Sequence, residues 1–67
     1  GGPTMPIAHI HILEGRTTEQ KKKLIEEVTG AIHSSIGADK SKIKILLHEI
    51  PEDDWATGGI TKREENQ

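Results

Sequence analysis

Residues 17–37, TTEQKKKLIEEVTGAIHSSIG, decide the fold, because they predict one helix with both of its ends marked. Thr17 and Gln20 match a capping box, in which the hydroxyl accepts an orphan N–H and the glutamine reaches back. Gly37 stands where a glycine commonly ends a helix. The spacing i, i+1, i+4, i+7, i+8 predicts a stripe facing the core, made of Leu24, Ile25, Val28, Ala31, Ile32, Ser35 and Ile36.

A short stretch rich in β-branched residues lies on each side of this helix. Residues 7–13, IAHIHIL, and residues 42–50, KIKILLHEI, each alternate along the chain and predict strands. The first has apolar residues on both faces, which indicates either a strand covered on both sides or one covered once and then packed against a neighbouring subunit. Residues 38–41 supply the turn before the second strand, and Pro51 ends it. Strand, helix and strand predict a β-α-β unit with parallel strands and a right-handed crossover.

The carboxyl-terminal part adds a small feature to this unit. Gly58 and Gly59 favour a tight turn, hence a short hairpin. Residues 62–67 are polar, so we expect a frayed end. The predicted fold class is α+β, one β-α-β domain with a short carboxyl-terminal hairpin.

The chain is too short to enclose a large core. It has 67 residues and no cysteine, which excludes disulfides and a cysteine nucleophile. Chains below about 70–80 residues usually need a disulfide, a metal or self-association for firm stability. We therefore expect a homo-oligomer, with a binding pocket built between subunits.

Composition excludes several kinds of partner. The formal charge is only −2, and Trp55 is the one residue among Phe, Trp and Tyr, so a nucleic-acid surface is not expected. The run Lys21–Lys23 is followed by Glu26 and Glu27, which indicates the solvated face of a helix. No apolar run reaches the ~18 residues of a spanning helix, so we expect no membrane segment and a cytoplasmic protein.

Three of the four histidines invite a metal interpretation. His9 and His11 share a strand face, and His48 could add a third ligand. No carboxylate or thiolate spacing completes a recognisable site, so we expect neither a metal nor a cofactor. His11 is interpreted as structural, and His33 as a helix-surface or interface residue.

The first five residues, GGPTM, have the character of an expression remnant followed by the initiator Met5. A single domain is therefore expected over residues 6–67. Removal of Met5 would make Pro6 the amino terminus.

From Pro6 onward the chain resembles the 4-oxalocrotonate tautomerase family. The run PIAHIHILEGR, which ends at Arg16, is similar to the opening of that family, and Leu-Glu-Gly-Arg directly precedes the capped helix. The similarity continues through Trp55 to Gly59, so it covers residues 6–59.

The resemblance implies a reaction and a base. Family members are β-α-β subunits, commonly hexameric dimer assemblies, which move a proton between carbon and oxygen in unsaturated 2-oxo acids. In the family the nitrogen of the amino-terminal proline is the general base, and Pro6 matches the position of that proline. An α-amino group ordinarily titrates near 7.7–8.0, and an apolar site beside cations lowers that value toward working pH. In the 67-residue chain this nitrogen is an amide, so we expect little activity while residues 1–5 remain.

Two cations match positions that hold the carboxylates of a dicarboxylate substrate. Arg16 matches the arginine that binds the distal carboxylate, for which a planar guanidinium is suited. The alternative is an exposed arginine paired with Glu14 or Glu19. Lys44 stands where the archetype has a second arginine. Lysine keeps the positive charge but lacks the planar pair of N–H donors of a guanidinium. Its alternative is a solvent-facing strand residue.

Three further residues match positions that line the family pocket. Trp55 replaces a phenylalanine as the apolar wall that excludes water, or else it packs at a subunit interface. Leu13 would contribute through its backbone. Thr57 replaces an apolar residue, which leaves its contribution open.

Two other functions fit the same residues. A proline-dependent dehalogenase, hydratase or decarboxylase of small unsaturated acids is one, and Glu49 and Glu52 are its candidate water-activating acids. A non-catalytic assembly module, in which the motifs serve packing, is the other.

Overall fold

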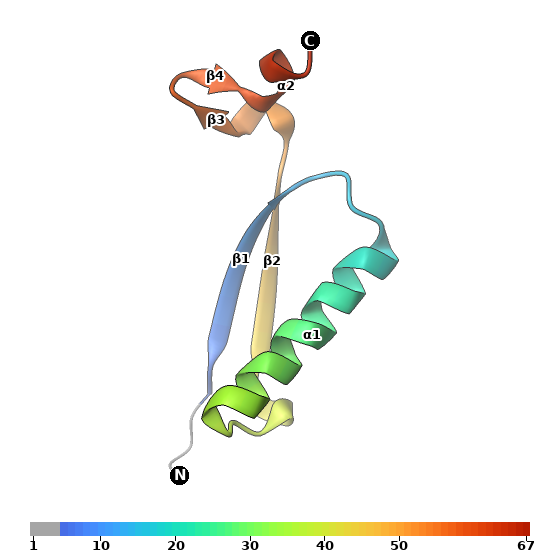
Figure 1. The fold of residues 1–67 in the computed structure, drawn as a ribbon, viewed down its shortest axis with the longest axis vertical. Coiled ribbons are helices and arrows are strands. Elements are labelled where there is room, and N and C mark those ends of the chain that lie inside the picture. The colour runs from blue at the N-terminus through green and yellow to red at the C-terminus, as the bar shows by residue number, and fades with distance from the viewer. Residues whose placement is uncertain (1–4) are drawn as a thin grey trace.

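The computed structural model describes residues 5–67, and the remnant predicted at residues 1–4 lies outside this range. Three elements form the main unit, the strand β1 (Ile7–Leu13), the helix α1 (Thr18–Ile36) and the strand β2 (Lys44–Ile50). The remaining elements are short, namely η1 (Lys40–Lys42), η2 (Glu52–Asp54), β3 (Ala56–Thr57), β4 (Ile60–Thr61) and α2 (Lys62–Glu65). The predicted α+β class with parallel strands and a carboxyl-terminal hairpin is confirmed (Figure 1).

Local hydrogen bonds close both ends of α1. The Gln20 backbone N–H donates to the Thr17 hydroxyl at 3.1 Å, and the Thr17 N–H donates to the Gln20 side chain at 2.9 Å. Gly37 has a φ of 73°, in the left-handed region that glycine adopts at no steric cost. Its N–H donates to the carbonyl of His33 at 3.0 Å, so both predicted caps are confirmed.

The two long strands pair in parallel, in a register from Ile7 opposite Lys44 to Leu13 opposite Ile50. β2 begins two residues later than predicted, because η1 forms a 3₁₀ turn where the strand was expected to start. Asp39 caps this turn by accepting the N–H and the hydroxyl of Ser41, both at 3.0 Å. These hydrogen bonds, the backbone one first, lower the pKa of the Asp39 carboxyl.

The predicted hairpin is confirmed as β3 and β4, which pair antiparallel around two glycines. Gly58 has a φ of 62° and Gly59 a φ of 84°. Two successive positive φ values match the tight turn that suits the twist of a hairpin.

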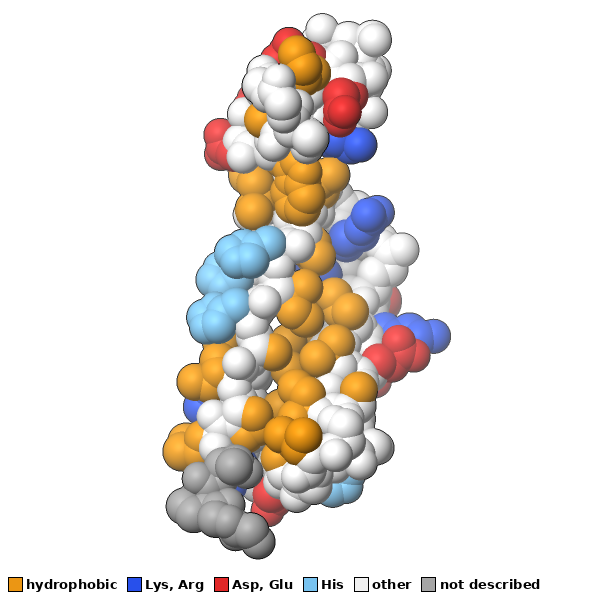
Figure 2. Space-filling model, turned by 60° about the vertical axis from the view of Figure 1, so that its left-hand side comes forward, with side chains coloured by type: hydrophobic (Ala, Val, Ile, Leu, Met, Phe, Trp, Pro, Cys, Tyr) orange, Lys and Arg blue, Asp and Glu red, His pale blue; other side chains and the backbone are white. Residues whose placement is uncertain are grey.

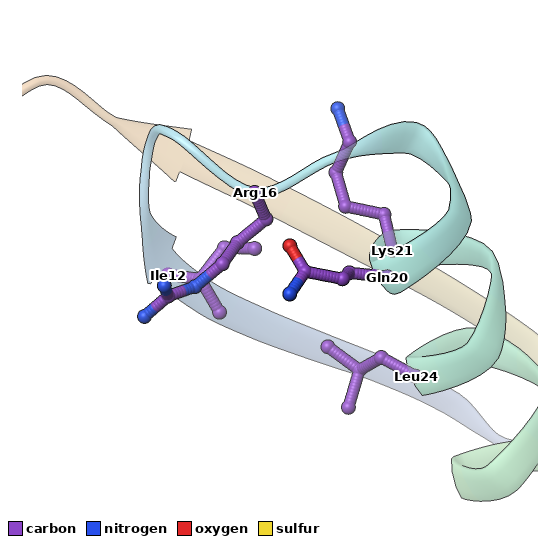
Figure 3. A pocket seen from close by; sticks show the side chains of 5 residues that line it. All are labelled: Ile12, Arg16, Gln20, Lys21 and Leu24. Carbon is purple, nitrogen blue, oxygen red and sulfur yellow. The ribbon is translucent and has the colours of Figure 1, made fainter.

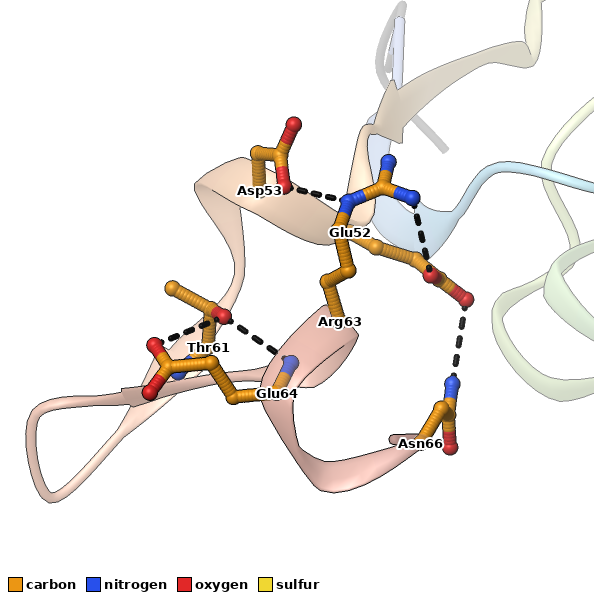
Figure 4. Close-up of polar contacts among 6 residues, drawn as sticks. All are labelled: Glu52, Asp53, Thr61, Arg63, Glu64 and Asn66. Atoms are coloured by element: carbon orange, nitrogen blue, oxygen red, sulfur yellow. Dashed lines mark hydrogen bonds and ion pairs between the residues drawn. The ribbon is translucent and has the colours of Figure 1, made fainter.

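The prediction of a frayed end is wrong, because residues 62–65 form α2. Thr61 and Glu64 make a second capping box, a T-x-x-E signature that is visible in the sequence. Arg63 pairs with Asp53, and Asn66 donates to Glu52 at 3.1 Å, so the tail is attached to η2 (Figure 4). The hydrogen bond to Asp53 raises the pKa of the Arg63 guanidinium.

The helix covers only one face of the sheet (Figure 1). The apolar strand residues facing α1 are half-buried, and they are Ala8, Ile10, Ile12, Ile45 and Leu47. Within residues 5–67, Ala38 is the only fully buried hydrophobic residue. On the predicted stripe Ala31, Ser35 and Ile36 are exposed, Ile36 by 63%. The subunit therefore lacks a closed core of its own.

The overall dimensions support the same conclusion. The extents are 49 × 25 × 14 Å and the radius of gyration is 15.4 Å. A compact domain of this length has a radius of gyration of about 11 Å. Within residues 5–67 no element covers the other face of β1, so cover on both sides by the chain itself is not found. Across residues 5–67, no helix has the length and apolarity needed to cross a bilayer.

Candidate active site

Parallel pairing brings Pro6 and Lys44 together at the amino ends of the two long strands. The Lys44 backbone N–H donates to the carbonyl of Pro6 at 3.0 Å. Pro6 is half-buried and Lys44 is exposed. No carboxylate of residues 5–67 lies within ion-pair distance of the Lys44 ammonium, whose charge is therefore available to an anion.

Arg16 lies at the opposite end of β1, in the loop that leads into α1. A shallow hollow of about 230 Å³ between the strand and the helix is lined by Ile12, Arg16, Gln20, Lys21 and Leu24. Figure 3 shows the side chains of Arg16, Gln20 and Leu24 around this hollow. In the described part of the chain Arg16 forms no ion pair, so neither Glu14 nor Glu19 neutralises it. Its guanidinium N–H groups can donate hydrogen bonds to a carboxylate.

Two polar residues of this hollow were not predicted as part of a site, nor were its apolar residues Ile12 and Leu24. Gln20 and Lys21 follow Arg16 by about one helical turn, which is the only signal in the sequence that places them beside it. Lys21 was interpreted as solvated, yet it is half-buried and donates to Glu49 at 2.8 Å, whereas Lys22 and Lys23 are exposed. This ion pair ties the start of α1 to the end of β2.

The remaining predicted pocket residues also lie near the carboxyl ends of the strands. Leu13 ends β1 and is half-buried opposite Ile50. Trp55 is half-buried between η2 and β3, and its carbonyl accepts the N–H of Lys62 at 2.7 Å. Thr57 is exposed in the hairpin.

The predicted site residues thus form two groups rather than one. The seven residues of β1 separate Pro6 from the Arg16 loop. At about 3.3 Å per residue, such a strand spans about 23 Å, far more than the length of a small dicarboxylate. Pro6 and Arg16 of one subunit therefore cannot hold the same substrate molecule.

The histidines do not form a recognisable metal centre. His9 and His48 approach within 2.9 Å, with the rings stacked, and the His11 ring stacks on His48. Among residues 5–67 there is no group of three or more His, Cys, Asp or Glu arranged to hold a metal ion. His33 lies on α1 and contacts the carbonyl of Ala38 at 2.7 Å, a helix-end role.

Comparison with known proteins decides the family. Residues 6–64 match the family described as tautomerase enzyme. The chain belongs to the tautomerase family. It is 40% identical over 60 residues to a 2-hydroxymuconate tautomerase of Comamonas testosteroni, covering 90% of this chain and 95% of that relative. It is 41% identical over 61 residues to a probable tautomerase of Staphylococcus epidermidis, covering 91% of this chain and 100% of that relative.

Solved structures of the family share the fold of this tautomerase. A 4-oxalocrotonate tautomerase isozyme of Methylibium petroleiphilum has a TM-score of 0.88 and 37% identity, covering 92% of this chain and all of that one. A heterohexameric 4-oxalocrotonate tautomerase of Chloroflexus aurantiacus has a TM-score of 0.85 and 32% identity, covering 90% of this chain and 97% of that one. The Chloroflexus relative is thus a heterohexamer, and the resemblance stated from the opening motif is confirmed.

Proposed function

We propose that this chain is an isomerase that ketonises 2-hydroxymuconate or a closely related 2-hydroxydienoate dicarboxylate, with Pro6 as the general base. The relatives named 2-hydroxymuconate tautomerase support the substrate class. The observation that carries the role of Pro6 is its position beside Lys44, whose ammonium has no carboxylate partner within residues 5–67.

The proposed reaction moves one proton. The secondary amine of an amino-terminal Pro6 accepts the proton of the 2-hydroxyl group, and the released electron pair forms the carbonyl and shifts along the diene. The ammonium then returns a proton to a distant carbon. A neighbouring cation disfavours the protonated amine, so Lys44 would keep more of the base in its active form. The same cation would stabilise negative charge on the substrate oxygen in the transition state.

Recognition of the second carboxylate is assigned to Arg16. A guanidinium can donate two parallel N–H hydrogen bonds to the two oxygens of a carboxylate, which orients the substrate as well as holding it. Trp55 would exclude water as an apolar wall, while Leu13 and Thr57 would line the pocket. No cofactor is needed for this proton transfer.

We further propose that each active site is built from different subunits of a homo-oligomer, of which a hexamer is the expected form. About 23 Å of strand separates the Pro6 end from the Arg16 end of one subunit. Assembly that places the amino end of one sheet beside the carboxyl end of another would complete the site. It would also cover apolar side chains left exposed in the isolated subunit, such as Ile7 and Ile36.

The alternative hydratase or dehalogenase gains no support from the two acids considered for it. Glu49 faces α1, where it accepts from Lys21 at 2.8 Å. Glu52 pairs with Arg63 and accepts from Asn66. Both carboxylates are therefore already engaged by side chains of this chain.

The deciding experiment measures ketonisation of 2-hydroxymuconate by ultraviolet absorbance. The 67-residue chain is compared with protein that begins at Pro6, and intact mass establishes the first residue of each. We expect fast turnover only with Pro6 at the amino terminus, because in the longer chain its nitrogen is an amide with no basic lone pair. Equal rates for the two forms would contradict the proposed base. No turnover by either form would contradict the proposed substrate.

A further inference from the structure

The sheet face opposite α1 carries a cluster of histidines that the proposed reaction does not use. Alternation along the paired strands places Ile7, His9 and His11 of β1 on this open face, with Lys44, Leu46 and His48 of β2 beside them. Ile7 is 54% exposed and Leu46 is 42% exposed. Figure 2 shows the histidine side chains in a continuous row, with hydrophobic side chains next to them. Imidazoles and apolar groups thus share one uncovered surface.

The imidazoles are in direct contact. His9 Nδ1 lies 2.9 Å from His48 Nε2, with the ring centroids 5.2 Å apart and the ring planes 15° apart. The His11 and His48 centroids are 4.6 Å apart, at an interplanar angle of 19°. A nitrogen–nitrogen contact of this length needs one N–H and one lone pair. The His9–His48 contact therefore cannot persist when both rings are fully protonated.

No negative charge on this face offsets protonation. Lys44 is the other charged residue on the open face of β1 and β2, and it adds a positive charge. Glu49 points to the opposite face, where Lys21 of α1 holds it. Glu14 follows β1, and its N–H donates to Ile50 at the strand ends. Each proton added to the cluster therefore increases an uncompensated positive charge.

We propose that His9, His11 and His48 make assembly of copies of this chain through the open sheet face dependent on protonation. The inference rests on the proposed homo-oligomer. A second copy is the occupant we assign, because the subunit has one fully buried hydrophobic residue within residues 5–67 and an uncovered apolar sheet face. A radius of gyration of 15.4 Å also shows that the subunit does not close on itself.

The sign of the effect follows from proton linkage. Packing copies together removes the imidazoles from water and brings further cations near them, and both changes disfavour the charged form. The assembled state then binds fewer protons than the separated subunits, so a fall in pH favours dissociation. Imidazoles ordinarily change charge between about pH 5 and 8, which sets the range for the measurement.

Sedimentation velocity from pH 8 to pH 5.5 tests this inference, on the 67-residue chain and on the form that begins at Pro6. Each excluded proton changes the dissociation constant by up to about tenfold per pH unit. We therefore expect that constant to rise at least about tenfold over this range. Circular dichroism at each pH reports whether α1 remains folded, which separates dissociation from unfolding.

Histidine variants locate the effect. His9→Gln combined with His48→Gln keeps polar groups of similar size but removes two of the three rings, and we expect a much weaker pH dependence of assembly, because His11 alone remains on this face. His33→Asn is the matched control, because it removes an imidazole outside the cluster and keeps an N–H for the Ala38 carbonyl. This control should dissociate as the unmodified chain does. If the double variant fails to assemble at pH 8, the face is supported as an interface, and the two single variants replace it in the pH comparison.

Three results would overturn the inference. They are equal assembly at pH 8 and pH 5.5, unchanged pH dependence in the histidine variants, and a monomer at pH 8 in both forms of the chain. Absence of 2-hydroxymuconate turnover together with pH-dependent assembly would reject only the proposed reaction.

Discussion

The two ends of the sheet differ in what they carry and in how they are built. The amino end places Pro6 beside Lys44 through one backbone hydrogen bond of 3.0 Å. The carboxyl end carries Arg16 beside the capped start of α1, and the Lys21–Glu49 ion pair ties that start to β2. The proposed groups for proton transfer thus lie apart from those for carboxylate recognition. In the proposed mechanism one subunit supplies two half-sites, which assembly would join.

The largest expected effect lies at the amino end. In protein that begins at position 6, Pro6→Ala replaces a secondary amine by a primary one in a less constrained backbone. We expect kcat for 2-hydroxymuconate to fall by about 10²–10⁴, the usual contribution of a general base. Retention of the full rate, with the amino terminus established by mass, would contradict the assigned role.

Lys44 tests the electrostatic part of the same end. Lys44→Gln should lower kcat by about 10²-fold, as loss of an oxyanion donor does. Lys44→Arg should keep kcat at the unmodified value or raise it, because the planar guanidinium can make two parallel hydrogen bonds to the substrate. Lys42→Gln is the matched control, because it removes the same charge from the exposed η1 turn. An equal fall in kcat in the Lys42 and Lys44 variants would show that Lys44 acts only as a general surface charge.

Arg16 tests the carboxyl end. Arg16→Ala removes a charged hydrogen-bonding group, and we expect kcat/KM to fall by about ten- to a hundredfold, mainly through KM. Lys23→Ala, at an exposed position of α1, should leave both constants unchanged. The fall in kcat/KM caused by Arg16→Ala should be much smaller for a monocarboxylate substrate than for the dicarboxylate. An equal fall for both substrates would contradict distal-carboxylate binding.

Mixing the two variants tests whether the ends meet across subunits. Pro6→Ala and Arg16→Ala chains, unfolded together and reassembled in equal amounts, should regain about a quarter of the wild-type number of active sites. Half of the chains carry an intact Pro6 and half carry an intact Arg16, so random assembly brings the two intact residues together in about one site of four. Activity no higher than the mean of the separate variants would place Pro6 and Arg16 in one subunit.

The smallest effect is expected at the tail. Arg63→Gln removes the pairs with Asp53 and Glu52, and exposed ion pairs contribute little to stability. Hydrogen exchange should quicken in residues 62–67 while the melting temperature changes little. A large fall in the melting temperature would show that the tail supports the assembled protein as a whole.

The predictions from sequence succeeded where their signals were local. The ends of α1 depend on Thr17, Gln20 and Gly37, each within one turn of the group that it caps. The hairpin followed in the same way from adjacent glycines. The tail helix was missed although Thr61 and Glu64 repeat the signature used at Thr17, since polar composition was given more weight than spacing. The later start of β2 shows that alternation alone does not locate a strand end.

By itself, the sequence determined the helix with its caps and the β-α-β order, because these follow from short-range spacing. The family followed from the resemblance of the opening motif, and the chain length led to the expectation of partner copies. Only the tertiary structure decided that Pro6 lies beside Lys44. It also decided that Lys21 pairs with Glu49 and that His9 contacts His48. These relations join residues far apart in the chain through the parallel register, and no local preference specifies a register between distant strands.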